Sequence, residues 1–137
     1  MSMLGDADWL LIDIPSFAEP TGMLSVVEIG AQFDFQVRRV FWVSAVTSPH
    51  AIRGEHAHGP LRQLIFCPTG SCNITLESRD GTTAHFTLSS SGQALLLNGP
   101  VWRSMTDFTP DCCMMVLCDR EYAQDRVIED YREFRGS

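Results

Sequence analysis

The sequence predicts a single all-β domain, built as a sandwich or barrel of short strands. Three observations support this prediction: the apolar or alternating runs are short, turn signals separate them at regular spacing, and only the last part of the chain has a helical pattern. A chain of 137 residues is large enough for one hydrophobic core, and no repeat, low-complexity segment or linker divides it. Residues 1–137 are therefore predicted to form one domain.

Turn-forming residues separate the predicted strands, as at Gly59-Pro60, Asp80-Gly81 and Gly99-Pro100. The run SCNITLES alternates between apolar and polar residues, which predicts a strand with one dry and one wet face. Asp80-Gly81 directly behind it predicts a hairpin to the following run. The predicted strands are WLLIDI (9–14), MLSVVEI (23–29), QVRRVFWVSA (36–45), RQLIFCP (62–68), SCNITLES (71–78), TTAHFTL (82–88), ALLLN (94–98), VWRSMTDF (101–108) and CCMMVLCD (112–119).

The last stretch, residues 121–134, is expected to be helical or irregular. It is rich in charged residues, and its apolar residues Val127, Ile128, Tyr131 and Phe134 recur at roughly helical spacing. This segment is therefore expected to form a short tail behind the strands.

The charge of the chain limits the partners it can have. Its net charge is −7, which argues against binding to nucleic acid or to an anionic membrane surface. A small anionic ligand remains compatible, because it needs only a local cluster of positive charge. All ten basic residues are arginine, so mechanisms that need a Schiff-base lysine or a P-loop lysine are excluded.

The five cysteines are expected to be buried free thiols. Their number is odd, no CxxC pair is present, and several lie in apolar runs such as CCMMVLC. Free thiols are typical of a reducing cytosol. The chain begins with acidic residues before a short apolar run, a pattern unlike that of a signal peptide, and no segment is long enough to span a membrane. A cytoplasmic location is therefore predicted.

Two of the four histidines, His56 and His58, stand two residues apart. On a strand, such residues point to the same face. Two imidazoles in one space can bind a metal, transfer protons, or form a hydrogen-bonded pair in a core. The core interpretation is the weaker one here, because a core does not collect several arginines and an amide without a ligand. The polar residues in the same two motifs are Arg53, Arg62, Gln63 and Arg103.

The segment from His56 to Gly70 resembles the first motif of the cupin barrels, with Gln63 in the place of the usual glutamate. Residues 98–103 resemble the second cupin motif, with Arg103 in the place of its final histidine. Cupin metal sites need about three imidazoles and a carboxylate, whereas this chain offers two imidazoles, a neutral amide and a cation. No metal is therefore expected, and the histidines are free for acid–base work near neutral pH.

A third candidate region is the run RRVFWV. Alternation places Arg39 on the face of Phe41 and Val43, so that only one of Arg38 and Arg39 can face a barrel interior. An inward arginine is a candidate phosphate ligand through its bidentate guanidinium. Phe41 and Trp102 are more often core residues, but at a barrel mouth either can stack on a base or a sugar.

Several segments in order resemble one specific cupin family. They are RRVFWV, IRGEHAHGPLRQLIFCPTGSCNITLESRDG, VWRSMTDF and CCMMVLCDREY. From about residue 10 to 134 the chain resembles the dTDP-4-keto-6-deoxyglucose 3,4-ketoisomerases, the WxcM-like sugar-nucleotide cupins. The resemblance implies a small cupin jelly-roll barrel, a homodimer with N-terminal strands exchanged or shared, and no metal or organic cofactor. It also implies a part in deoxysugar supply, for example for a polysaccharide.

The reaction implied by the resemblance moves a carbonyl from C4 to C3 of a dTDP-linked deoxyhexose through an enediolate. His56 and His58 would be the acid–base pair, and the sequence does not assign which one is the base. Arg53 and Gln63 would orient the sugar or stabilise the oxyanion. Arg39 would lie near the diphosphate, with Phe41, Trp102 and Arg103 as further substrate-binding candidates.

The chain departs from the family pattern at several positions near the expected pocket. Arg103 stands where the family often has histidine, Phe41 where it has tyrosine, Thr21 where it has arginine, and Arg62 where it has an acidic residue. These changes leave open an isomerase for another sugar nucleotide and a non-catalytic cupin that binds a nucleotide sugar or a small acid. A metal-dependent cupin, such as a dioxygenase or a metal-dependent isomerase, is a third alternative. They also leave open the stereochemistry at C4.

Overall fold

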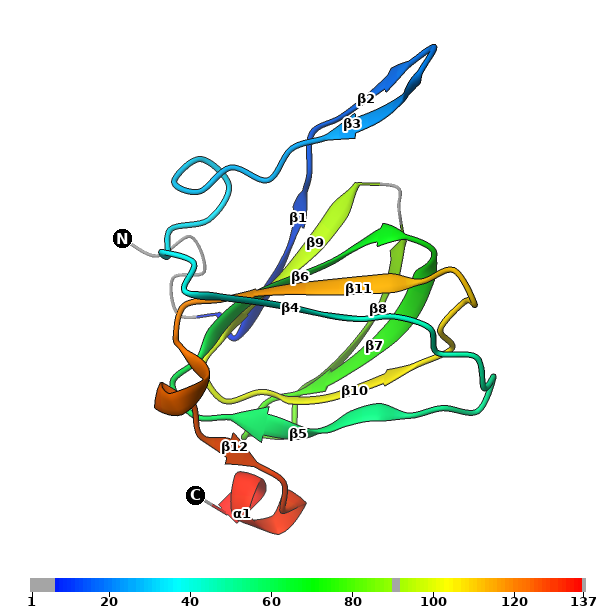
Figure 1. Ribbon diagram of the computed structural model, residues 1–137. Coiled ribbons are helices and arrows are strands. Elements are labelled where there is room, and N and C mark those ends of the chain that lie inside the picture. The colour runs from blue at the N-terminus through cyan, green and yellow to red at the C-terminus, as the bar shows by residue number, and fades with distance from the viewer. Residues whose placement is uncertain (1–6, 90–91, 137) are drawn as a thin grey trace.

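Two five-stranded antiparallel sheets pack face to face in the computed structural model, which describes residues 7–89 and 92–136 (Figure 1). The first sheet has the order β1-β9-β6-β11-β4 and the second has the order β12-β5-β10-β7-β8. The strands of the first sheet are β1 (Trp9–Asp13), β9 (Gln93–Asn98), β6 (Arg62–Thr69), β11 (Cys113–Cys118) and β4 (Arg39–Val43). Those of the second are β12 (Val127–Ile128), β5 (Arg53–His58), β10 (Trp102–Thr106), β7 (Ser71–Glu77) and β8 (Thr83–Ser89).

The predicted all-β architecture is confirmed, but the two sheets do not close into a barrel in the part of the chain that the structure describes. No strand pairing joins the first sheet to the second within the described residues, so the jelly roll is a two-layer sandwich rather than a closed hydrogen-bonded barrel. The hairpin expected at Asp80-Gly81 is confirmed between β7 and β8, where Glu77 pairs with Thr83. Its turn is residues 78–82, closed by a backbone hydrogen bond from Ser78 to Thr82.

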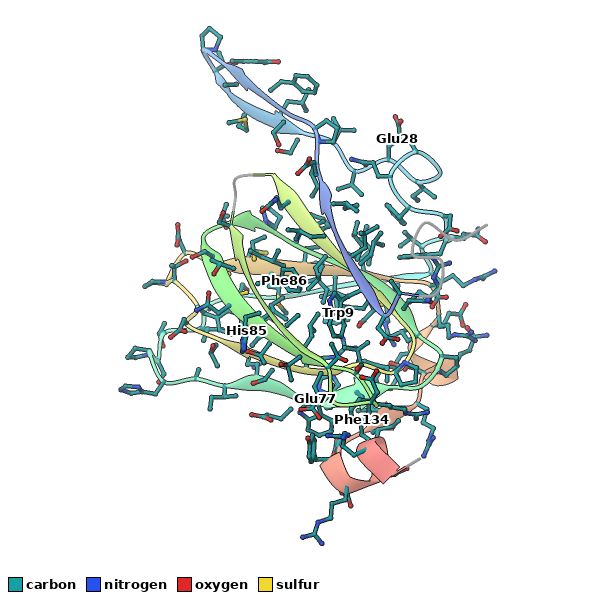
Figure 2. All side chains as sticks on the ribbon, turned by 180° about the vertical axis from the view of Figure 1, so that it is seen from behind. Trp9, Glu28, Glu77, His85, Phe86 and Phe134 are labelled. Atoms are coloured by element: carbon teal, nitrogen blue, oxygen red, sulfur yellow. The ribbon has the colours of Figure 1, made fainter. Side chains whose placement is uncertain are left out.

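The main core lies between the two sheets. Alternation in β7 buries Cys72, Ile74 and Leu76 while the residues between them stay partly exposed, as expected for a sheet with one wet face. Trp9 from β1 and Phe86 from β8 pack against this core from the two sheets (Figure 2).

The first sheet is covered on both faces around β9. Leu95 and Leu97 face the main core, whereas Leu96 packs on the other side against Phe33 and Phe35 from the loop ahead of β4. This second layer explains why the run ALLLN is continuously apolar instead of alternating.

An N-terminal hairpin projects from the sandwich (Figure 1). It consists of β2 (Ser16–Glu19) and β3 (Gly22–Ser25), which pair with each other as a separate two-stranded sheet. Its large apolar side chains Phe17, Met23 and Leu24 are more than half exposed. The strand predicted for residues 23–29 therefore ends at Ser25, and β2 was not predicted, because this hairpin has no buried face that would impose a clear pattern.

The C-terminal tail is helical and irregular, as predicted, except that Val127 and Ile128 form strand β12 and pair with β5 instead of continuing a helical pattern. A 3-10 turn η1 (Tyr122–Gln124) precedes β12, and a short helix α1 (Tyr131–Gly136) ends the described chain. Phe134 in this helix is fully buried against Trp102, with ring centroids 5.8 Å apart. Arg135 binds Glu77 of β7 at 2.9 Å, which ties the tail to the lower end of the second sheet (Figure 2).

All five cysteines are free, and four of them are buried, while Cys113 is half-buried. No helix among the described residues has the length and apolar character that a membrane crossing would require.

Candidate functional site

The two histidines of β5 face one small cavity between the sheets, with a volume of about 90 Å³. Its other walls come from β4, β6, β10 and β11. The residues that line it are Phe41, Val43, Arg53, Gly54, His56, His58, Gln63, Ile65, Arg103, Met105, Met114 and Val116.

A β-bulge at Glu55 brings Arg53 into this group. His56 pairs with Arg103 on β10, but Gly54 pairs with the next residue, so Glu55 is an extra residue without a partner. Glu55 and Gly54 both have positive φ, 54° and 86°. Regular alternation would place Arg53 and His56 on opposite faces of β5. The extra residue moves Arg53 to the same face as His56, so both side chains line the cavity.

Gly54 is also required where the strands cross. A Cβ at this position would lie 2.9 Å from the carbonyl oxygen of Arg103 and 3.1 Å from the sulfur of Met105. Its positive φ lets its own carbonyl accept a hydrogen bond from His56 Nδ1 at 2.8 Å. The glycine of the RGEHAH segment therefore fixes the first imidazole.

The two imidazoles are arranged so that their Nε2 atoms face each other at 3.1 Å. A carbonyl only accepts hydrogen bonds, so His56 Nδ1 must carry a proton to bind Gly54. His58 Nδ1 lies 2.8 Å and 3.0 Å from the two carboxylate oxygens of Asp125, which also only accept. In the neutral state both Nε2 atoms are therefore lone-pair acceptors directed at one shared position.

The environment keeps this pair neutral at rest. Burial, together with the nearby Arg103 cation, lowers the pKa of His58 to about 4, although Asp125 opposes the shift. Burial also lowers the pKa of His56. Both imidazoles can thus accept a proton at neutral pH, and a proton on either Nε2 would be shared with the other.

Asp125 completes the site, and the sequence analysis did not identify it. Its side chain is only 4% exposed and binds Arg39 Nη2 at 3.0 Å as well as His58. Burial opposes ionisation of Asp125, but the hydrogen bonds from Arg39 and His58 outweigh it and lower its pKa. The carboxylate is therefore charged, and it fixes the tautomer and orientation of His58.

A buried cation lies on the other side of the histidines. Arg103 is 3% exposed, donates to Gln63 Oε1 through Nη1, and binds the carbonyl of Val101 at 3.3 Å. Gln63 in turn donates to Cys118 Sγ at 3.5 Å. Burial lowers the pKa of Arg103 to about 10, so it remains charged at neutral pH. This buried charge is not neutralised by an ion pair, because no carboxylate of residues 7–89 and 92–136 forms a salt bridge with Arg103.

Of the eight candidate residues, the structure brings six around this cavity: His56, His58, Phe41, Arg53, Gln63 and Arg103. Arg39 does not line the cavity, but it binds Asp125, which in turn binds His58. The guanidinium of Arg39 lies 5.8 Å from the Phe41 ring, which confirms the prediction that Arg39 is on the same face of β4 as Phe41 and Val43. Trp102 lies apart. It alternates with the inward Arg103 on β10 and packs on the outer side against Tyr131 and Phe134.

Two larger hollows lie elsewhere. One of about 300 Å³ lies under the N-terminal hairpin, between Ile14, Met23 and Phe66, and is mainly apolar. Another of about 340 Å³ lies over β7 and β8 near His85 and Asp107, and it is wide open to solvent. Neither combines buried titratable groups as the histidine cavity does, so the chemistry of the side chains favours the smaller cavity.

The donor set of the histidine cavity is a poor match for a metal. Within the described part of the chain, no third histidine, cysteine or carboxylate offers a ligand atom within 4.8 Å of both imidazoles. The buried Arg103 cation would also repel a divalent ion. The absence of a metal stays a prediction.

Comparisons with known proteins identify the family of the chain. A family model described as "FdtA: WxcM-like, C-terminal" matches residues 7–137. A curated TDP-4-oxo-6-deoxy-alpha-D-glucose-3,4-oxoisomerase from Aneurinibacillus thermoaerophilus is 32% identical over 126 residues, which cover 91% of this chain and 88% of that protein.

Solved structures give the same result. QdtA, a sugar 3,4-ketoisomerase from Thermoanaerobacterium thermosaccharolyticum crystallised with TDP, matches with a TM-score of 0.84 and 30% identity, over 94% of this chain and 93% of that chain. WlaRB, a TDP-quinovose 3,4-ketoisomerase from Campylobacter jejuni, matches with a TM-score of 0.85 and 25% identity, over 95% and 98%. The expected cupin fold class and the resemblance drawn from the motifs are thereby confirmed. The chain belongs to the FdtA family of WxcM-like proteins.

Proposed function

We propose that this protein is a sugar-nucleotide 3,4-ketoisomerase that moves the carbonyl of dTDP-4-keto-6-deoxyglucose from C4 to C3. One observation carries the mechanism: two neutral imidazoles direct lone pairs at a shared position, 3.1 Å apart, beside a buried arginine. The curated relative is named as an oxoisomerase of this sugar, which supports the substrate. A QdtA variant with one histidine replaced by asparagine, 29% identical to this chain, was crystallised with TDP-4-keto-6-deoxyglucose.

The proposed reaction needs no oxidant, because the two carbons exchange oxidation states. One Nε2 removes the C3 proton, the C–H electrons form a C3–C4 double bond, and the C4 carbonyl electrons move to its oxygen. The C3 hydroxyl then gives its proton to the oxygen on C4, the electrons left on the C3 oxygen form the C3 carbonyl, and the double-bond electrons take the proton held by the histidines at C4. The histidine pair holds the transferred proton between these steps.

The charges around the pair fit the intermediate. The enediolate carries negative charge on oxygen, and Arg103 is a buried cation whose hydrogen-bond partners in the described part of the chain, Gln63 and Val101, are neutral. A fixed cation in a low-dielectric site stabilises an oxyanion more strongly than water does. We assign Arg103 and Gln63 to this role.

The nucleotide would lie outside the small cavity. A volume of about 90 Å³ has room for the reacting edge of a sugar but not for a whole nucleotide. Phe41 and Arg53 are exposed and line the cavity, so they are the candidates at its mouth. Arg39 has two buried guanidinium nitrogens, Nε and Nη1, without a hydrogen-bond partner among the described residues, and they are proposed donors for the diphosphate.

We further propose a homodimer in the cytoplasm. The residues Phe17, Met23 and Leu24 of the N-terminal hairpin are exposed and apolar, and so are Val40 and Trp42 on edge strand β4; exposed apolar residues of this kind are what a second copy would cover. Light scattering should give a dimer mass. The double substitution Phe17→Asp and Leu24→Asp should give a folded monomer, and an unchanged dimer mass would exclude the hairpin from the interface.

Proton NMR of dTDP-4-keto-6-deoxyglucose in deuterated water tests the reaction. We expect loss of the C3 proton signal and growth of a 3-keto product, and the coupling at C4 gives the stereochemistry. The double variant His56→Asn and His58→Asn should lose both changes, while His85→Asn, which alters an exposed histidine on β8, should keep them. Full turnover by the double variant would refute the catalytic assignment.

The alternatives give different spectra. A binding-only cupin would broaden the dTDP resonances without solvent exchange at C3. An isomerase for another sugar nucleotide would bind TDP and convert a different 4-keto sugar. A metal-dependent cupin would contain a stoichiometric transition metal when purified without a histidine tag.

A further inference from the structure

Three buried cysteines converge at the end of the core opposite to the histidines. Cys67 of β6 lies 3.8 Å from the sulfur of Cys72 on β7 and 3.8 Å from that of Cys112, and all three sulfurs lie within 4.8 Å of one another. Each residue is at most 3% exposed. We call these three residues the thiol cluster. The β6–β11 ladder separates it from the histidine site, because Gln63 lies at one end of this ladder and Thr69 at the other.

The backbone around the thiol cluster holds the sulfurs together. Gly70 has a φ of 67°, and a Cβ there would lie 2.5 Å from the Cα of Cys112, so only glycine lets the two segments approach this closely. Thr109 donates its backbone N–H to the Ser71 carbonyl at 2.9 Å and accepts the Ser71 N–H on its hydroxyl at 2.9 Å. The three thiols are therefore preorganised by contacts that do not involve sulfur.

The thiol cluster offers three sulfur ligands to an ion, and its surroundings are apolar. Of the residues that the structure describes, no fourth histidine, cysteine or carboxylate joins the group. The thiol cluster belongs to the main hydrophobic core, whose other members are aliphatic or aromatic residues, two methionines and Cys118. The neighbouring Cys72 thiol and burial raise the pKa of Cys67, and burial raises the pKa of Cys112 to about 12.

These surroundings select an ion by its charge. Three thiolates carry three negative charges, so a monovalent or divalent ion would leave a net negative complex in an apolar core, which is costly. A trivalent ion gives a neutral complex. An ion with a stereochemically active lone pair also needs no fourth ligand, unlike the tetrahedral zinc sites of proteins.

We propose that the thiol cluster is a binding site for trivalent arsenic or antimony, taken up as the neutral trihydroxide. In this step As(OH)3 reacts with three thiols to give As(SR)3 and three water molecules. Three S–H and three As–O bonds break while three As–S and three O–H bonds form, without any change of oxidation state. The site is independent of the proposed isomerase reaction.

The geometry fits three-coordinate ligation. At a thiolate–metal bond length of ~2.3 Å, the two sulfur pairs that lie 3.8 Å apart subtend an angle of about 110° at the ion. The sulfurs of Cys72 and Cys112, which lie within 4.8 Å of each other, must approach to a similar separation by side-chain shifts. Cys67 also borders the hollow under the N-terminal hairpin, which provides an approach from outside the core.

The test uses the reduced full-length protein and sodium arsenite. After gel filtration we expect one arsenic per chain by elemental analysis, and X-ray absorption should show three As–S bonds. Cys72→Ala and Cys112→Ala should each weaken retention at least tenfold. Cys113→Ser is the matched control, because Cys113 is adjacent to Cys112 but half-buried and outside the cluster, and it should bind like the unaltered protein.

The opposite results would overturn the proposal. If the thiols serve only as small apolar core residues, the folded protein will retain no arsenic. Two As–S bonds instead of three, or equal loss of binding in Cys113→Ser, would place the ion elsewhere. Tighter binding of Zn²⁺ or Cu⁺ with release of protons would refute the choice of a trivalent ion. The absorption measurement needs no variant, so it decides the matter even if a substitution prevents folding.

Discussion

Replacing Asp125 with asparagine tests whether the carboxylate positions the histidine pair. Asp125→Asn keeps the shape of the side chain but removes its charge, which His58 and Arg39 contact at 2.8 Å and 3.0 Å. Removing one member of a buried ion pair costs about 3–5 kcal/mol. Arg39 is 16% exposed, so we expect the lower end, about 3 kcal/mol. For a domain of this size that is a fall in melting temperature of roughly 10 °C.

The effect on catalysis has a definite sign. Asp125 raises the pKa of His58 against burial, so its loss makes His58 a weaker base and favours the wrong tautomer. We expect kcat to fall by ~10²–10³, within the range that general acid–base catalysis contributes. KM should change much less than kcat. The acid limb of the pH–rate profile should move to lower pH, because the folded-state pKa of His58 falls further.

Solvent exchange at C3, followed by proton NMR across pH, is the assay for this variant. Asp111→Asn is the control, because Asp111 is exposed and precedes Cys112 at the other end of the core. Asp125→Glu should recover part of kcat by restoring the charge. If Asp125→Asn keeps its kcat and an unshifted acid limb, the carboxylate has no positioning role, whatever its effect on melting temperature.

Three further predictions follow from the same geometry. The pKa of His58 falls from 6.5 to about 4 on folding, so the free energy of unfolding should fall by about 3 kcal/mol as the pH is lowered from 6.5 to 4, with full stability above pH 6.5. Urea unfolding at several pH values measures this loss, and His58→Asn should make the free energy of unfolding depend less on pH. Arg103→Met should lower kcat by ~10²-fold or more while TDP affinity changes little, and a loss of TDP affinity alone would move Arg103 from the sugar to the nucleotide. Gly54→Ala should destabilise the fold by roughly 1–3 kcal/mol and reduce kcat, because an alanine is strained at this positive φ and its Cβ pushes β5 away from β10. An unchanged melting temperature would contradict this prediction.

Local periodicity predicted most of the framework and part of the site. The spacing of His56 and His58 placed both on one face, and alternation placed Arg39 with Phe41; both are confirmed. These predictions succeed because period-two patterns depend only on the strand itself. The same rule excludes Trp102 from the cavity once Arg103 faces inward, since neighbours on a strand point to opposite sides.

Other parts of the site needed three-dimensional information. Alternation alone would separate Arg53 from His56, and only the bulge at Glu55 unites them. Asp125 lies 67 positions from His58, in an irregular segment where other carboxylates are equally good candidates by sequence. The one available signal was chemical, because a histidine used as a base commonly has an acceptor at its second nitrogen.

In the proposed mechanism, the arrangement of fixed charges gives Asp125 and Arg103 complementary roles. Transfer of the C3 proton creates a positive charge on the imidazole pair and a negative charge on the sugar oxygens. Asp125 lies on the side of His58 away from His56, where it would stabilise the imidazolium. Arg103 lines the cavity proposed for the sugar, where it would stabilise the oxyanion. Arg103 also lowers the proton affinity of both histidines at rest, which keeps them free to act as bases. Each charge thus offsets one half of the charge separation, and substitution of either should reduce kcat even when the other is intact.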